Sequence, residues 1–153
     1  LYTKCVPVGL SAGGLHAIKL AAKHPEMVSA LYLDAPVLNL LSILNFSGSC
    51  PGNESFKEEV LNALNLTLSE LISYREHPLD KLPALVANRI PVILVYGVVD
   101  RVCPFHENGA LLVKAYEGKG IDLEVYGKEG CDHHPHGLED PAPIINFLLQ
   151  HAD

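Results

Sequence analysis

Short apolar runs alternate with amphipathic segments along the chain, and each kind of run predicts one kind of element. Apolar runs at 3–8, 28–33 and 90–97 predict buried strands, and the apolar–acidic alternation at 121–126 predicts a half-exposed edge strand. A helix that connects two consecutive strands makes them parallel. The pattern therefore predicts an α/β fold with a parallel sheet of about four strands flanked by helices.

Helices are predicted between these strands and after the last one. The segment 15–23 is rich in helix-forming residues and stops before Pro25, 107–116 is followed by glycines, and the last helix begins at Pro141. In the first of these helices, His16 lies on the polar side with two lysines. We therefore expect His16 to face solvent and to have no catalytic part.

The segment 38–87 interrupts the alternation of strand and helix. It holds a Ser-, Gly- and Asn-rich loop at 45–53, a predicted helix at 54–65, and a capping box at Thr67 that opens another helix ending near His77. Loops at the carboxyl ends of parallel strands are where α/β proteins bind ligands. We predict a small helical lid or cap here, and an elaborated crossover connection is the alternative.

Composition limits the classes of function. The chain has 153 residues, of which 48% are hydrophobic and 19% charged, as expected for a single globular domain over 1–153. Its apolar runs are too short to cross a membrane. The net charge of −7 argues against nucleic acid as a partner, because a phosphate backbone needs a basic surface. A small or neutral substrate fits this composition better.

The sequence Gly-Leu-Ser-Ala-Gly-Gly at 9–14 lies between a predicted strand and a predicted helix. A serine at such a turn projects its hydroxyl from a rigid support, and glycines are expected two residues before and two after it because the turn crowds its neighbours. Gly9 and Gly13 stand at these positions around Ser11. The following helix offers free N–H groups, so we expect Ala12 N–H to be the first half of an oxyanion hole.

A serine nucleophile needs a basic histidine, and the histidine needs a carboxylate that orients it. Strand ends meet at one edge of a parallel sheet, and they carry Ser11, Asp34, Asp100 and a histidine-rich cluster at 132–136. The order Ser, Asp, His is the order of an α/β-hydrolase triad. Either aspartate, and any histidine of the cluster, satisfies this order.

Three motifs resemble those of α/β hydrolases, in particular esterase-like members related to the prolyl oligopeptidase group. They are Gly-Leu-Ser-Ala-Gly-Gly at 9–14, Tyr-Leu-Asp-Ala-Pro-Val at 32–37 and His-His-Pro-His-Gly-Leu-Glu-Asp-Pro-Ala-Pro-Ile at 133–144. The resemblance extends over essentially the whole chain, and it implies the C-terminal part of an α/β-hydrolase fold.

The resemblance also implies roles for particular residues. Ser11 would be the nucleophile, Asp100 the acid and His133 the base, with Gly97 and Pro104 at the family's positions around the acid. Asp34 is a rival for the acid, and His134 and His136 are rivals for the base.

Four further residues, and a metal, were considered for the site. We expect Leu10, Asp34, His106 and His134 to line the substrate site. Adjacent histidines point in different directions, and the cluster does not match a zinc-ligand spacing. We therefore expect neither a cofactor nor a functional metal.

These observations predict a serine hydrolase that cleaves small acyl esters, carbohydrate esters among them, through an acyl-enzyme. A peptidase or acyltransferase could use the same residues, and a binding module could keep the fold without a working site. The chain begins without methionine at the strand that leads to Ser11, so we expect the front half of a longer fold to be missing. The open strand edge then predicts a partner: an N-terminal segment, another chain or a second copy of this chain.

Overall fold

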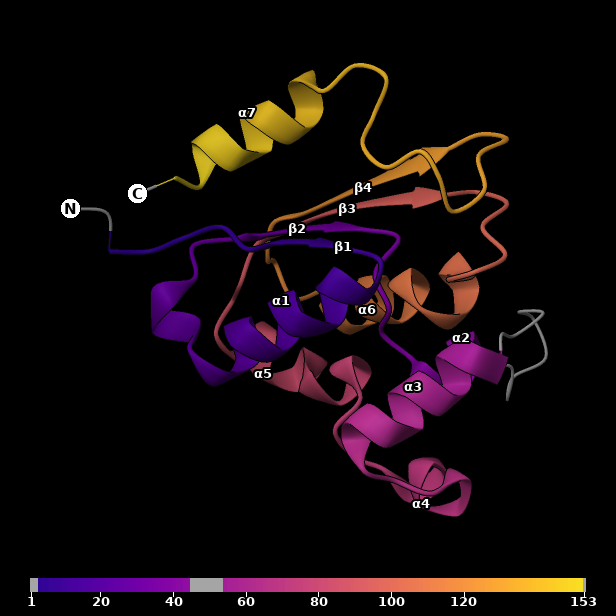
Figure 1. The fold of residues 1–153 in the computed structure, drawn as a ribbon. Helices are drawn as coiled ribbons and strands as arrows, with labels where there is room; N and C mark the ends of the chain where they lie inside the picture. Colours follow the sequence, from indigo (N-terminus) through magenta and orange to yellow (C-terminus); the bar gives the residue numbers. More distant parts are fainter. Residues whose placement is uncertain (1–2, 45–53, 153) are drawn as a thin grey trace.

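A parallel sheet is the centre of the molecule (Figure 1). The computed structural model describes residues 3–44 and 54–152. The sheet has four strands in the order β1-β2-β3-β4, and every neighbouring pair is parallel. The strands are β1 (Val8–Leu10), β2 (Leu31–Asp34), β3 (Val92–Gly97) and β4 (Leu123–Lys128). The predicted α/β fold class is confirmed.

All four strands begin later than predicted, and the difference is largest for β1. The run at 3–8 was expected to be a strand, but only an isolated bridge between Cys5 and Val28 forms there before β1 starts at Val8. Pro7 interrupts the ladder because proline has no N–H to donate. Its carbonyl still accepts a hydrogen bond from Tyr32 N (3.1 Å). β1 is therefore shorter than predicted and ends directly before Ser11.

Helices cover both faces of the sheet (Figure 1). One face carries α1 (Ala12–Lys23), α5 (Leu82–Ala87) and α6 (Gly109–Tyr116), and the other carries α7 (Ala142–Gln150). β3 is buried over nearly its whole length, and β2 over all of it, so apolar side chains of both strands pack against helices on both sides. Because β2 and β3 are packed on both faces, the loops that follow their carboxyl ends start from fixed positions.

The insertion between β2 and β3 is helical. It contains α2 (Leu40–Ile43), α3 (Glu54–Leu64), α4 (Leu68–Ser73) and a 3₁₀ turn at Pro78–Lys81. The predicted capping box is present, because Thr67 Oγ1 accepts from Glu70 N (3.3 Å) and Glu70 Oε2 accepts from Thr67 N (2.8 Å). The second helix ends at Ser73, earlier than predicted. The predicted loop at 45–53 lies outside the described residues.

Two shorter 3₁₀ turns complete the fold, at Pro25–Met27 after α1 and at Phe105–Glu107 before α6. The predicted helix at 107–116 therefore starts at Gly109, after such a turn. Within the described part of the chain, no helix is both long and apolar enough to span a bilayer.

The outer edge of β1 is exposed. Val8 keeps 54% and Leu10 40% of its surface accessible, and no strand among the described residues pairs with this edge. β4 forms the other edge, and its side chains alternate between half-buried and exposed along part of its length, as expected for an edge strand.

Candidate active site

Ser11 occupies a strained turn between β1 and α1. Its φ of 49° and ψ of −119° put a non-glycine residue at positive φ, which costs on the order of 1–3 kcal/mol. Three backbone hydrogen bonds hold this conformation. Ser11 N donates to Asp34 O (2.9 Å), and Ser11 O accepts from Val37 N (2.9 Å) and Gly14 N (3.0 Å). The serine is therefore fixed by the ends of two adjacent strands.

The glycines around Ser11 differ in how closely they are packed. A Cβ on Gly9 would lie 2.7 Å from Gly14 Cα, and one on Gly14 would lie 2.5 Å from Pro36 Cβ. A Cβ on Gly13 would meet nothing within 4 Å. The expectation that Gly13 relieves crowding at the turn is therefore wrong, and Gly14 meets that requirement.

His133 joins the serine to an aspartate. Its Nε2 lies 2.8 Å from Ser11 Oγ, and its Nδ1 lies 2.8 Å from Asp100 Oδ2. The His133 side chain is 9% exposed, and that of Asp100 is fully buried. A carboxylate only accepts hydrogen bonds, so Nδ1 carries the proton and Nε2 is left to accept the serine O–H. The three side chains form a continuous chain of hydrogen bonds.

The loop after β3 keeps Asp100 ionised. Burial by itself would raise the pKa of Asp100, but the hydrogen bond from His133 and those from Cys103 N and Val102 N lower it below its usual range. Both N–H groups lie 2.8 Å from Oδ1. The charge is therefore available to orient His133 and to stabilise an imidazolium.

Ala12 begins α1 directly after the serine and is exposed. Within the described residues its N–H has no hydrogen-bond acceptor. Free N–H groups in the first turn of a helix favour negative charge nearby. The Ala12 N–H is therefore available to an oxyanion formed next to Ser11.

The loop that carries His133 lies directly against the end of β3. A Cβ on Gly97 would lie 2.1 Å from Asp132 O, so only glycine permits this approach. Asp132 accepts from Arg101 N (2.9 Å), Arg101 Nε (2.8 Å) and His133 N (2.9 Å). The bonds from Arg101, with that from His133 N, lower the pKa of Asp132 to about 2. Sequence reasoning missed this anchoring role of Asp132.

The contacts of Asp34 do not fit the predictions that it binds substrate or acts as the acid of the triad. Its side chain is fully buried and accepts hydrogen bonds from Tyr32 Oη (3.1 Å), His136 Nδ1 (3.1 Å) and Gly137 N. Burial and the adjacent Asp34 charge raise the pKa of Tyr32. Ser11 Oγ is bonded to His133 Nε2, and no hydrogen bond joins His136 to Ser11 within the described residues, so His133 and not His136 stands where the base is needed.

The other expected site residues are mostly exposed side chains around the triad. His134 is exposed, and its ring packs edge-on against His133 with centroids 5.0 Å apart. His106, with a side chain 70% exposed, lines a surface hollow beside Asp100. Leu10 ends β1 immediately before Ser11 and is 40% exposed. His16 is exposed, as expected.

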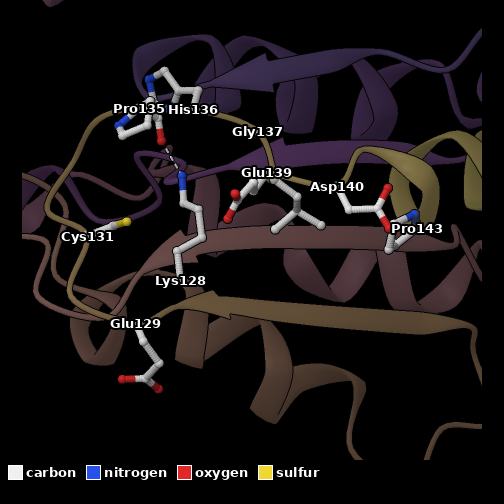
Figure 2. Close-up of a pocket in the computed structure, with 10 residues that line it drawn as sticks. Lys128, Glu129, Cys131, Pro135, His136, Gly137, Glu139, Asp140 and Pro143 are labelled. Atoms are coloured by element: carbon white, nitrogen blue, oxygen red, sulfur yellow. Dashed lines mark hydrogen bonds between the residues drawn. The ribbon is translucent and has the colours of Figure 1, made fainter.

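The segment 131–138, which carries the three histidines, is called the histidine loop. A larger hollow, with a volume of about 710 Å³, lies beneath it (Figure 2). Lys128 reaches from the end of β4 toward this loop and donates a hydrogen bond to Pro135 O (Figure 2). Its Nζ is also 3.9 Å from Asp34 Oδ1. The loop is thus held by Lys128 at Pro135 and by Asp34 at His136 and Gly137.

An apolar cavity of about 210 Å³ opens beside Ala12. One side is formed by the segment that follows β2 and the other by α3. Its lining residues are Ala12, Leu15, His16, Val37, Leu40, Ile43, Phe56, Val60, Ala63 and Leu64. Sequence reasoning predicted an insertion here but did not identify this lining, although the apolar positions after Pro36 were a signal for it.

The model of the prolyl oligopeptidase family matches residues 2–153. The chain belongs to this family. Members share the α/β-hydrolase fold, and the resemblance derived from the three motifs is confirmed. Among curated proteins, none matches the sequence.

Solved structures share the fold. A puromycin-hydrolyzing peptidase from Mycobacterium tuberculosis is 21% identical with a TM-score of 0.66, over 92% of this chain and 20% of that one. A puromycin hydrolase with an S511A substitution is 23% identical with a TM-score of 0.62, over 94% and 20%. A monoacylglycerol lipase from Paleococcus ferrophilus is 17% identical with a TM-score of 0.60, over 97% and 69%.

The chain spans about a fifth of the length of the puromycin hydrolases that it resembles. The family and these solved structures share the α/β-hydrolase fold. They include both lipases and peptidases, so the choice between ester and peptide depends on the site itself.

Asn108 connects the loop 98–104, which carries Asp100 and is called the acid loop, to the cavity. Sequence reasoning did not identify this residue. Its side chain is buried; Oδ1 accepts from Leu38 N and Asn39 N (3.0 Å each), and Nδ2 donates to Pro104 O (3.1 Å) and Ser42 Oγ (3.3 Å). All its hydrogen-bonding capacity is used. A buried histidine, His77, adds a bond by accepting from Leu40 N through Nδ1 (3.2 Å).

Proposed function

We propose that this protein is a serine hydrolase that cleaves carboxylic esters through an acyl-enzyme. The observation that carries the proposal is the position of His133, which is 2.8 Å from both Ser11 Oγ and Asp100 Oδ2. Nucleophilic catalysis by serine requires this connected geometry of nucleophile, base and orienting carboxylate.

The steps follow from the hydrogen bonds. Ser11 Oγ attacks the ester carbonyl carbon while its proton passes to His133 Nε2, and Asp100 stabilises the imidazolium. The oxyanion accepts from Ala12 N–H. His133 then gives the proton to the departing alcohol oxygen as the ester C–O bond breaks. Water, deprotonated by His133, hydrolyses the acyl-enzyme and returns the proton to Ser11.

The cavity beside Ala12 supports a small apolar acyl group as the part of the substrate held by the enzyme. Apart from His16, its walls are alanine, aliphatic residues and one phenylalanine. A charged acyl group would lose its hydration there without gaining a partner. The alcohol portion would lie outside this cavity, and esters of carbohydrates and other polar alcohols are the proposed substrates.

Peptide hydrolysis is a second candidate, favoured by the prolyl oligopeptidase family match. The same triad attacks amides, and an acyltransferase would use the acyl-enzyme with an alcohol in place of water. A second oxyanion donor would come from a segment or a partner chain that adjoins β1, and so would any contacts that select peptides.

Hydrolysis rates on matched ester and amide substrates test the proposal. The purified protein would be given p-nitrophenyl acetate and butyrate, and the acetyl and butyryl p-nitroanilides as the matched amides, with Ser11→Ala as the control. We expect ester hydrolysis to exceed both amide hydrolysis and the rate of the control. Faster amide turnover would identify a peptidase instead.

Covalent labelling separates slow catalysis from none. Intact-mass spectrometry after a fluorophosphonate probe should show one adduct that maps to Ser11. If the wild type forms no adduct and hydrolyses esters no faster than Ser11→Ala, the chain is a binding module with an unused triad.

A further inference from the structure

We propose that His133, His134 and His136 form a binding site for a divalent transition-metal ion of the zinc class, and that the bound ion blocks Ser11. The three histidines each offer one ring nitrogen, and these nitrogens all lie within 4.8 Å of one another. The blocking effect rests on the proposed function, whereas the metal site itself does not.

The rings gather in one place, contrary to the expectation that neighbouring histidines point apart. Their centroids are 5.0 Å apart for His133 and His134, 5.4 Å for His133 and His136, and 4.7 Å for His134 and His136. Nitrogens bonded to a tetrahedral ion at about 2.0–2.1 Å lie about 3.4 Å apart. The nitrogens lie within 4.8 Å of one another, so binding an ion requires them to move closer by side-chain rotation, chiefly of His134.

Two of the histidines are already oriented as metal ligands usually are. His136 Nδ1 binds Asp34 Oδ1 (3.1 Å), and His133 Nδ1 binds Asp100 Oδ2 (2.8 Å). A carboxylate on one ring nitrogen fixes the tautomer and makes the other nitrogen a better ligand. Both residues therefore present Nε2, the nitrogen that a metal would take.

The third ligand is free to adjust. His134 is exposed, and within the described residues its ring nitrogens have no hydrogen-bond partner. The backbone on both sides of it is restrained, since Lys128 donates to Pro135 O and Asp132 binds Arg101. A rigid loop with one mobile imidazole suits Zn²⁺, Cu²⁺ and Ni²⁺, which accept imidazole ligands readily.

Metal binding and catalysis compete for one atom. His133 Nε2 is 2.8 Å from Ser11 Oγ and is the only nitrogen of this ring that does not face Asp100. An ion on Nε2 leaves no base for the serine proton. The site is therefore inhibitory, and chelation restores the free imidazole.

Zinc titration of the metal-free protein tests the site without any substrate. Competition with a chromophoric chelator should show one Zn²⁺ per chain. His134→Asn and His136→Asn should each weaken its affinity by at least about 10-fold, the lower limit for losing even an outer-sphere partner. His24→Asn, at a half-exposed histidine that follows the last residue of α1, is the matched control and should bind like the wild type. The proposal is overturned if the wild type binds no zinc, or if His134→Asn binds as tightly as the wild type.

Labelling of Ser11 by the fluorophosphonate tests inhibition. We expect zinc to slow labelling, EDTA to restore it, and His134→Asn to need at least about 10-fold more zinc for the same slowing relative to its own metal-free rate. Zinc binding without any labelling in metal-free protein would reject the proposed hydrolase and leave the metal site standing. Labelling that zinc does not slow would reject the inhibitory site and leave the hydrolase standing.

Discussion

Two carboxylate–histidine pairs lie side by side at the carboxyl ends of β2 and β3. Asp34 pairs with His136, and Asp100 pairs with His133; both carboxylates are fully buried and both bind Nδ1, at 3.1 and 2.8 Å. Only His133 has Ser11 on its other nitrogen. A buried Asp–His pair therefore does not by itself define a triad, because a nucleophile must also lie within hydrogen-bond distance of the second ring nitrogen of the histidine.

The two aspartates also differ in their remaining partners. Asp100 Oδ1 is held by backbone N–H groups of its own loop. Asp34 instead connects β2 to distant parts of the chain through Gly137 N and the nearby Lys128, and it also accepts from Tyr32 Oη on its own strand. We therefore interpret Asp100 as the catalytic member and Asp34 as a structural residue beneath the histidine loop.

Replacing each aspartate by asparagine should separate these roles most strongly. Asp100→Asn should lower kcat by about 10⁴-fold, because the amide favours the wrong tautomer of His133. Asp34→Asn should mainly lower the free energy of unfolding, by on the order of 3 kcal/mol, since Lys128 and His136 lose a buried partner. Ester hydrolysis and urea denaturation of both variants measure this. Equal losses of kcat with unchanged stability would remove the distinction.

Gly97→Ala should affect both pairs together. Its Cβ would lie 2.1 Å from Asp132 O and 2.6 Å from Cys131 O, so the loop that carries both histidines must move. We expect a loss of about 1–3 kcal/mol in unfolding free energy and a fall of about 10²-fold in kcat from misplacement of His133. Gly13→Ala, which meets no atom within 4 Å, is the control for stability. A fully active Gly97→Ala would mean that the loop tolerates displacement.

Low pH should lower the stability of the protein by weakening the hydrogen bonds of Asp132 at the start of the loop that carries both histidines. The pKa of Asp132 is lowered from 3.8 to about 2 by Arg101 and His133 N, so its ionised form stabilises the folded state above pH 3.8. This stabilisation is lost as the pH falls toward about 2. Thermal unfolding followed across this window should show a smaller acid-induced loss in Asp132→Asn than in the wild type. Parallel curves would show that Asp132 does not contribute.

Much of this arrangement could be predicted from sequence because it depends on chain order and strand ends. The strand–turn–helix around Ser11 and the position of Asp100 after a buried strand both follow from local patterns. The choice between Gly13 and Gly14 could not be made, because it depends on Pro36 from the next strand end. The gathering of three histidines likewise depends on tertiary contacts of their loop.

The insertion was predicted from its composition and capping box, but its use as a cavity wall was not. Val37, Leu40 and Ile43 are apolar in any reading of the sequence. Asn108 fixes the backbone between Val37 and Leu40 by accepting hydrogen bonds from Leu38 N and Asn39 N. These partners are 70 and 69 residues away from it in the sequence. This bonding directs the apolar side chains toward α3. Long-range hydrogen bonds of this kind leave no local pattern.

The two walls of the cavity are supported differently, and this matters for protein engineering. Asn108 and His77 tie one wall to the backbone that also positions the acid loop. The other wall is one face of α3, with Phe56, Val60 and Leu64 directed toward the cavity. A library that varies these three α3 positions would reshape chain-length selectivity while leaving the catalytic loops in place, so the helix is the part of this scaffold to redesign first.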